Sequence, residues 1–256
     1  MIDVNAYLGH FAFRQLRYNT AGGLLRLMDR AHIEKAVVSS AAAITYRNAQ
    51  SGNEEVFGEV KNHRDRLIPF AVLNPAYADW QHDLKVCREE FGMRGLRLYP
   101  NWHGYKLTDS RCLELVHAAA AHRLPISIPF RVEDRRQQSW LVDIPNVEPR
   151  EAAALARAVP EARFIFGNTS GLAASELGRG DNLPANYSIE ISLLTALLTN
   201  EIGALLRSLG EDRILFGSGM PFHYPEGAVA KLEVLDAPAG VKEKIARGNA
   251  KGLLGL

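Results

Sequence analysis

Short apolar runs alternate with amphipathic segments along the whole chain. The runs are rich in Val, Ile and Phe, as expected for strands that are buried on both faces, and the segments between them have helical spacing. A parallel sheet produces this alternation, because a crossover helix must connect each strand to the next. Eight runs of this kind occur, and they begin near Ile2, Glu34, Leu67, Arg94, Pro125, Arg163, Tyr187 and Arg213.

The number of runs and the length of the chain together predict an α/β fold, a closed (β/α)8 TIM barrel. Dividing 256 residues among eight units gives 32 residues per unit, and no Pro-, Gly- or Ser-rich linker separates them, so we expect one domain over residues 1–256. An open doubly wound sheet is the structural alternative, but no run leads into a glycine-rich phosphate-binding fingerprint. The stretch 129–149 is rich in proline and arginine, which predicts an irregular loop at the mouth of the barrel.

The overall charge narrows the classes of partner. There are 30 Lys and Arg residues against 29 Asp and Glu, so the formal net charge of +1 gives no general attraction to nucleic acid or to anionic membranes. The N-terminus lacks a signal-peptide pattern, and no apolar run approaches the length of a membrane span. Cys87 and Cys112 have no metal-ligand spacing, and so few thiols indicate a reducing compartment. We therefore expect a cytoplasmic protein with neither nucleic acid nor membrane as a partner.

Motifs at the ends of the predicted strands resemble those of the amidohydrolase-related TIM barrels, which include aminocarboxymuconate semialdehyde decarboxylase and related metal-dependent hydrolases. The resemblance extends over nearly the whole chain and depends on the order of the motifs. It implies the same barrel and a hydrolase or decarboxylase activity on a small molecule. The motifs are IDVNAYLG at 2–9, NP at 74–75, GLRLYP at 95–100, LPISI at 124–128, RILFGSGMPF at 213–222 and GNA at 248–250.

The resemblance also implies a divalent metal, usually zinc. In that family the ligands are a His-x-His pair on the first strand, a His ending the fifth, often another ending the sixth, and an Asp ending the eighth. Such a set holds zinc and leaves an open position at which water is activated. The eight histidines of this chain show no HxH, HxxxH or HExxH spacing. We therefore expect no metal and no cofactor. The family's ligand positions are occupied here by Asn5, Tyr7, Pro129, Asn168 and Gly219.

Alternation of side chains along each strand predicts a polar barrel interior. Glu190 shares a face with Ser188 and Ser192, whereas Tyr187, Ile189 and Ile191 are expected to face the helices. A buried carboxylate needs a compensating charge, so we expect Arg97 to form a structural ion pair with Asp3. The other residues predicted to point inward are Asn5, Tyr7, Tyr99, Ser127, Pro129, Phe164, Phe166 and Asn168.

The first functional hypothesis is a metal-independent hydrolase, lactonase or decarboxylase that acts on a small, anionic, carboxylate-bearing molecule. Glu190 is its candidate general base or acid, beside Arg97, and Tyr7 and Asn168 would donate hydrogen bonds to a developing oxyanion. Exposed helix faces would also permit a homo-oligomer. The residues predicted to bind the substrate are Asn5, Tyr99, Ser127, Arg131 and His223.

Two alternatives stay open. The second hypothesis is a catalytically inactive pseudoenzyme kept for ligand binding or assembly, because Pro129 and Gly219 remove side-chain chemistry from two ligand positions. The third is a rearranged metal site that uses His103 or His223. The first two differ in one structural feature. An enzyme needs a water-accessible cup around Glu190, whereas a scaffold can fill it with aromatic rings, and we expect the cup to be partly open.

Overall fold

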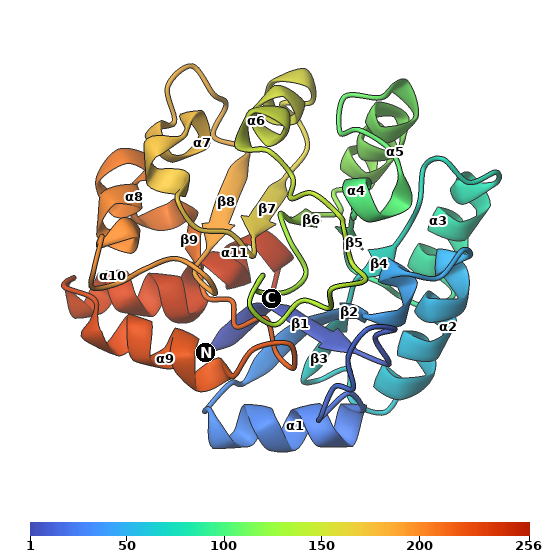
Figure 1. Ribbon diagram of the computed structural model, residues 1–256, viewed down its shortest axis with the longest axis horizontal. Helices are drawn as coiled ribbons and strands as arrows, with labels where there is room; N and C mark the ends of the chain where they lie inside the picture. The colour runs from blue at the N-terminus through green and yellow to red at the C-terminus, as the bar shows by residue number, and fades with distance from the viewer.

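The chain forms a barrel of parallel strands surrounded by helices. The computed structural model describes residues 1–256, and Figure 1 looks onto the barrel, with the strands in the middle and the helices around them. The third of the eight strands is divided into β3 and β4 by Phe70. The strands are β1 (Ile2–Leu8), β2 (Lys35–Ser40), β3 (Leu67–Pro69), β4 (Ala71–Val72), β5 (Leu96–Arg97), β6 (Ile126–Pro129), β7 (Phe164–Gly167), β8 (Tyr187–Glu190) and β9 (Ile214–Leu215).

Hydrogen bonds connect the strands in chain order and close the ring. Parallel pairing runs in order from β1 through β2 to β3, and again in order from β4 to β9. Between β3 and β4, the amide of Phe70 donates to the carbonyl of Val38. The ring closes where the amide of Val4 donates to the carbonyl of Phe216, and Tyr7 donates to Met220. These features confirm the predicted (β/α)8 TIM barrel. With β3 and β4 counted as one strand, each of the eight strands begins within two residues of its predicted start.

Helices follow the strands, as the helical spacing predicted. Thr20 caps α1 by accepting a hydrogen bond from the amide of Gly23. Residues 130–148 contain no helix or strand, which confirms the predicted irregular loop between Pro129 and Pro149. No helix in the structure combines the length and apolarity needed to cross a bilayer. The helices are α1 (Ala21–Arg30), α2 (Ala49–Val60), α3 (Trp80–Glu89), α4 (Pro100–His103), α5 (Ser110–Ala121), α6 (Pro149–Ala158), α7 (Glu176–Arg179), α8 (Glu201–Leu209), α9 (Pro225–Val234), α10 (Ala239–Glu243) and α11 (Asn249–Leu254).

The hydrophobic core has three parts. The largest lies between the strands and the surrounding helices, and it includes both cysteines as free, buried thiols. A second part fills the barrel interior, where Ala250 and Leu254 of α11 pack with inward-facing strand residues such as Ile165. A third part, at the mouth, combines aliphatic residues with four aromatic rings, those of Tyr7, Phe11, Tyr99 and Phe222. Phe164 and Phe166 belong to the outer part, so the prediction that they point inward is wrong: β7 has the opposite phase, with Ile165 inside.

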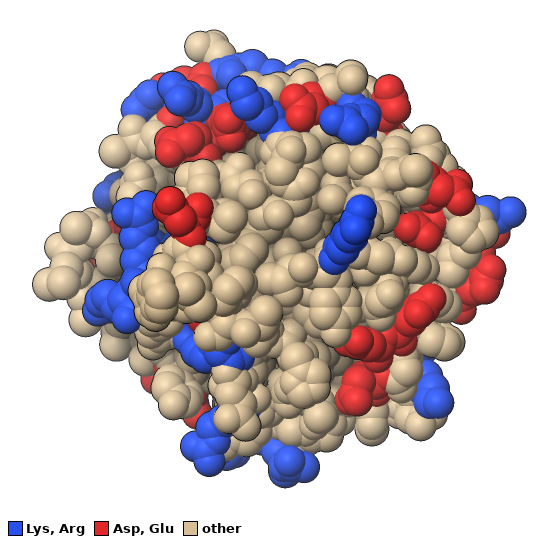
Figure 2. Space-filling view, turned by 45° about the vertical axis from the view of Figure 1, so that its right-hand side comes forward, with Lys and Arg blue, Asp and Glu red and all other residues tan.

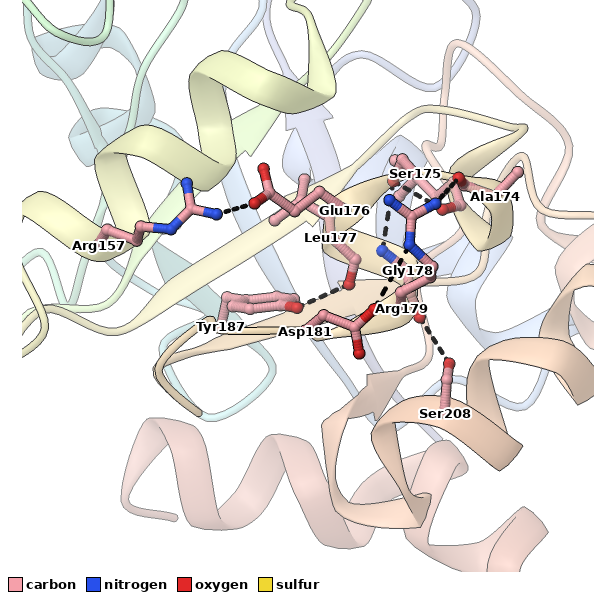
Figure 3. A network of polar contacts seen from close by, with 11 residues as sticks. Arg157, Ala174, Ser175, Glu176, Leu177, Gly178, Arg179, Asp181, Tyr187 and Ser208 are labelled. Carbon is pink, nitrogen blue, oxygen red and sulfur yellow. Dashed lines mark hydrogen bonds and ion pairs between the residues drawn. The ribbon is translucent and has the colours of Figure 1, made fainter.

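Polar contacts fix the connection that follows β7. Figure 3 shows Tyr187 of β8 and Ser208 of α8 directed at the short helix α7. The Tyr187 hydroxyl donates to the carbonyl of Leu177 at 2.6 Å, and the Ser208 hydroxyl donates to that of Gly178 at 2.5 Å. Arg157 of α6 adds an ion pair with Glu176. These contacts restrain the segment that begins with Asn168.

Candidate functional site

A bulge in β1 determines which of its side chains enter the barrel. The pairing between β1 and β2 shifts between Asp3 and Ala6. Val4 packs in the interior below the bulge and Tyr7 in the mouth above it, while Ala6 contacts the outer core. The extra residue therefore lets Asn5 point inward as well, as predicted.

Arg97 stabilises this bulge through hydrogen bonds to its backbone. Its side chain is fully buried, and its guanidinium donates to the carbonyls of Ala6 at 3.0 Å and Val4 at 3.2 Å, and to the Ser39 hydroxyl at 3.0 Å. It also lies over the ring of Tyr7, 4.7 Å from the centroid. No carboxylate pairs with it, so the predicted ion pair between Asp3 and Arg97 is wrong. Arg97 binds backbone carbonyls that the irregular pairing leaves available.

Asp3 instead binds the segment after β9. Because Val4 faces the interior, alternation places Asp3 on the other face of the strand. Its Oδ1 accepts hydrogen bonds from the amides of Asn5 at 2.8 Å and Ser218 at 3.0 Å, and its Oδ2 contacts the Ser218 hydroxyl. Burial raises the pKa of Asp3 from 3.8 to about 7, although the hydrogen bonds from Ser218 and Asn5 oppose this shift.

We predict that the free energy of unfolding of Asp3→Asn, relative to that of the wild-type protein, increases as the pH rises from about 4 to 7. The folded pKa of Asp3 lies above its ordinary value, so the folded state holds a proton that the unfolded state has released across this range. The carboxyl's contribution to stability is therefore present at pH 4 and lost by pH 7, by up to about 4 kcal/mol. Asn has the shape of the protonated acid and does not titrate. Urea unfolding of both proteins at several pH values measures the difference, and a pH-independent difference would contradict a protonated Asp3.

Glu190 lies at the centre of a buried hydrogen-bond network. Its Oε1 accepts from the backbone amide of Asn168 at 2.6 Å, from the Ser192 hydroxyl at 2.7 Å and from Asn5 Nδ2 at 3.2 Å. Its Oε2 accepts from the amide of Ser192 at 2.6 Å. Asn168 completes the network by donating from Nδ2 to the Tyr7 hydroxyl at 3.0 Å and accepting at Oδ1 from Asn5 Nδ2 at 2.7 Å. The structure thus brings together Glu190, Asn168, Tyr7 and Asn5.

Two glycines make room for the Glu190 side chain. A Cβ added at Gly167 of β7 would lie 2.2 Å from Glu190 Oε1, and one added at Gly217 after β9 would lie 2.4 Å from Oε2. Glu190 is only 2% exposed. The carboxylate is therefore packed between its two neighbouring strands and connects them through its hydrogen bonds.

Asn168 reaches the interior because its backbone is in the left-handed region, with φ of +51°. The preceding residue, Gly167, faces the Glu190 side chain, so simple alternation would point Asn168 outward. The left-handed turn redirects the side chain toward Tyr7 and Asn5. The prediction of an inward Asn168 is therefore confirmed, although the predicted strand phase behind it is wrong.

The mouth of the barrel is closed over this network. Tyr7 packs edge-to-face on Phe222, with ring centroids 4.9 Å apart, and Phe222 packs on Phe11 at 5.0 Å. Tyr99 is also buried, and the cavity that it lines measures about 10 Å³, roughly the space for one water molecule. Ser127, the second residue of β6, is 6% exposed. The expectation of a partly open cup around Glu190, Arg97 and Asn168 is wrong, because aromatic rings fill that space.

His223 occupies the space beside Gly219, where the resemblance places a metal-binding Asp. The amide of His223 donates to the carbonyl of Gly219 at 3.1 Å, and a Cβ added at Gly219 would lie 2.6 Å from His223 Cδ2. Nε2 of His223 is buried and has no hydrogen-bond partner. Burial, with the charge of Arg14 nearby, lowers the pKa of His223 from 6.5 to about 4, so the ring is neutral at pH 7.

A cavity of about 260 Å³, here called the mouth cavity, lies against His223, on the outer side of Phe222. Its charged lining residues are Arg14 and Arg17, and it has no acidic lining residue. Arg14 donates to the carbonyl of Phe222 at 2.8 Å and to Gln137 Oε1 at 2.9 Å, which positions the loop that carries His223. Arg14 was not among the predicted site residues, because nothing near it in the sequence indicates that it contacts the loop after β9.

Arg131 does not reach this cavity. It lines a separate groove between the 129–149 loop and α9. The five residues predicted to bind substrate are therefore divided. Asn5, Tyr99 and Ser127 are buried in the barrel and His223 borders the 260 Å³ cavity, while Arg131 borders the groove and also the 10 Å³ cavity that Tyr99 lines.

The donors at the predicted metal position do not suit zinc. They are amide, phenol and hydroxyl groups with one carboxylate, and the carboxylate already accepts four hydrogen bonds. No group of three or more His, Cys, Asp or Glu side chains in the structure is arranged to hold a metal ion.

Comparison with known proteins identifies the family. The family model for amidohydrolases matches residues 14–256. No curated protein matches the chain. Among solved structures, the 2,6-dihydroxybenzoate decarboxylase from Rhizobium has a TM-score of 0.70 at 19% identity, covering 91% of this chain and 87% of its own. The dihydroxybenzoic acid decarboxylase from Polaromonas sp. JS666, solved with bound manganese and the inhibitor 2-nitroresorcinol, has a TM-score of 0.72 at 20% identity, covering 100% and 98%.

An uncharacterised TIM-barrel protein from Bordetella bronchiseptica has a TM-score of 0.75 at 15% identity, covering 100% of this chain and 99% of its own. At these identities the structural similarity concerns the fold, whereas the family model matches most of the sequence. The chain therefore belongs to the amidohydrolase family.

Proposed function

We propose that this protein is a hydrolase-type enzyme that acts without the family's metal ion on a small carboxylate-bearing molecule bound at the mouth cavity. The observation that carries the proposal is that His223 lines a 260 Å³ cavity while its Nε2 is buried without a hydrogen-bond partner. A buried polar atom without a partner costs stability, and such groups are found where a ligand or reaction uses them.

The lining of the cavity supports an anionic substrate. Arg17 forms no ion pair and supplies positive charge, whereas Arg14 is already paired with the buried Glu133 at 3.3 Å. The tyrosines at 18 and 224 supply aromatic surface. A guanidinium binds a carboxylate through two parallel hydrogen bonds, which suits an acid with a small apolar body. The two decarboxylases named above also act on, or are named for, aromatic carboxylates.

His223 is the proposed general base. It is neutral at pH 7, and Nε2 is buried, so the ring must turn toward the cavity for Nε2 to accept a proton from a water molecule that attacks an ester or lactone carbonyl. The acyl C–O bond then breaks, and the alcohol leaves with the proton returned from Nε2. Glu190 is a poor candidate for that role, because both of its oxygens are engaged and its side chain is buried. We therefore assign a structural role to Glu190, Asn168 and Tyr7, whose hydrogen-bond network supports the loop that carries His223.

Metal independence is part of the proposal and is supported by the chemistry of the interior. Asn5, Tyr7 and Asn168 hydrogen-bond to one another, where the family resemblance requires metal ligands. The ring of His223 fills the space that an Asp side chain at Gly219 would need. A metal at this position would require His223 to move and the network to break.

A second candidate function is ligand binding without catalysis. The observation that favours it is the closed mouth, where Tyr7, Phe222 and Phe11 separate the polar interior from solvent. In that case the mouth cavity would bind a carboxylate, and His223 would act only as a hydrogen-bond partner.

Chelator-treated protein and mono-4-nitrophenyl succinate, an ester that carries a free carboxylate, test the enzymatic proposal. We expect nitrophenol release that is unchanged by added zinc or manganese and lost in His223→Gln. The matched control is His122→Gln, a histidine beyond the end of α5 and remote from the cavity. Release that depends on metal would contradict metal independence. Binding of the ester without release in the wild-type protein would favour the second candidate.

The pH dependence separates His223 from an ordinary histidine. With a pKa of about 4, the base is already neutral at pH 6, so kcat/KM for the ester should be flat between pH 6 and 8. A histidine with its ordinary pKa near 6.5 would instead give a rise across that range. A rise centred near pH 6.5 would contradict the burial assigned to His223.

A further inference from the structure

A second cavity, of about 630 Å³, lies outside the barrel between α9 and the segment that follows β8. It shares no lining residue with the mouth cavity. Leu194, Leu197 and Leu198 form one wall, and Ala230 and Val234 of α9 form the other. Its volume is within the range of about 300–1,000 Å³ that is typical of small-molecule sites.

The walls are unusually apolar for a surface. Leu198 is 96% exposed and Leu197 is 71% exposed, although leucine side chains normally pack away from water. Figure 2 shows, for one face of the protein, that charged side chains lie mostly at the rim around a largely uncharged centre, with acidic and basic ones interleaved along the top. In the groove, apolar side chains are gathered beside cations.

Arg131 is the distinctive polar group of the groove. Its side chain is about half buried, burial lowers its pKa, and its guanidinium forms no hydrogen bond or ion pair in the structure, with Nε buried and unpartnered. Its neighbour Asp134 is not free to neutralise it, because both Asp134 oxygens accept hydrogen bonds from the Arg136 guanidinium, at 3.0 and 2.8 Å.

Lys231 adds a second positive charge. Its Nζ donates to the carbonyls of Ser192 and Ile191, and no carboxylate pairs with it. The groove therefore combines two cations that lack an anionic partner with a wall of leucines. Burying a guanidinium without a counter-charge is costly, so a ligand that supplies an anion would be favoured.

We propose that this groove binds an amphipathic carboxylate, with the carboxylate on Arg131 and the apolar tail along the leucine wall. Lys231 already donates to two backbone carbonyls, so Arg131 is the group left to bind an anion, which favours a monoanion. The long apolar wall favours an aliphatic or aromatic tail over a small polar acid. The site is separate from the mouth cavity and does not depend on the enzymatic proposal.

Isothermal titration of the wild-type protein with octanoate, 1-octanol and acetate tests this site. We expect saturable 1:1 binding of octanoate, and much weaker binding of both octanol, which lacks the charge, and acetate, which lacks the tail. Arg131→Gln should weaken octanoate binding by about tenfold or more, in line with the loss of a charged hydrogen-bond pair. Arg135→Gln is the matched control, because Arg135 is exposed on the same loop and does not line the groove.

Gly227→Leu provides a second variant that leaves Arg131 intact. A Cβ added at Gly227 contacts nothing within 4 Å, so the larger side chain fits on α9 and enters the groove. We expect it to block octanoate without lowering the melting temperature. Octanoate affinity that is equal in the wild-type, Arg131→Gln and Gly227→Leu proteins would overturn the proposal. So would sedimentation showing that the wild-type protein is a dimer and Gly227→Leu a monomer, because a second copy would then occupy the groove.

Discussion

Glu190→Gln should lower the free energy of unfolding by about 3 kcal/mol or more. Gln has the size of Glu, but one of its two terminal atoms is an NH2 group. Whichever way the Gln side chain is turned, its NH2 group must face a backbone N–H that now donates to Glu190. That N–H belongs to Asn168 on the Oε1 side and to Ser192 on the Oε2 side. A buried N–H left facing another donor costs about 1–3 kcal/mol, and the lost hydrogen bonds to a charged acceptor cost a similar amount each.

Urea unfolding measures this effect, with Glu233→Gln as the control because Glu233 is exposed on α9. Gly217→Ala is an independent variant of the same contact, since its Cβ would press on Glu190 Oε2. If Glu190→Gln unfolds at the wild-type urea concentration but abolishes ester hydrolysis, Glu190 is a catalytic base rather than the structural carboxylate described above.

Arg97→Met should be the most destabilising of the variants considered, by about 3–5 kcal/mol. Methionine keeps much of the side-chain volume but leaves the carbonyls of Val4 and Ala6 without their buried donor, and it removes the cation from the ring of Tyr7. Arg97→Lys should recover only part of the loss, because an ammonium group cannot reproduce the planar set of donors that reaches both carbonyls.

Thermal unfolding by circular dichroism checks this ordering, with Arg17→Met as the control at an exposed position. We expect Arg97→Met to unfold at the lowest temperature, Arg97→Lys between it and wild type, and Arg17→Met at the wild-type temperature. Equal stability of Arg97→Met and Arg17→Met would show that the bulge in β1 does not depend on the guanidinium.

The barrel could be predicted because its signals are local. Each strand is a short apolar run, and the inward face of β8 follows from simple alternation of Ser188, Glu190 and Ser192 with larger apolar residues. The sequence contains Gly167 and Gly217 but gives no reason for a glycine at either position. The reason appears in the structure, where both pack against the side chain of Glu190.

The site was harder to predict because it depends on departures from regular geometry. The bulge in β1 moves Asp3 away from Arg97, and the positive φ of Asn168 reverses the direction of its side chain. Alternation assumes a regular strand, so it fails at both positions. The contact between His223 and Gly219 arises from the turn after β9, and the packing of Arg14 on Phe222 joins residues 208 positions apart.

We propose that hydrogen-bonding side chains take the place of the family's metal, and metal content tests this most directly. Protein purified without chelator and without a metal-affinity tag should contain far less than one equivalent of zinc, manganese or iron by elemental analysis, and should not gain one on dialysis against zinc. One equivalent of metal per chain that is lost in Asn5→Ala or Asn168→Ala would contradict this proposal, because it would show that these residues help to bind a metal ion inside the barrel.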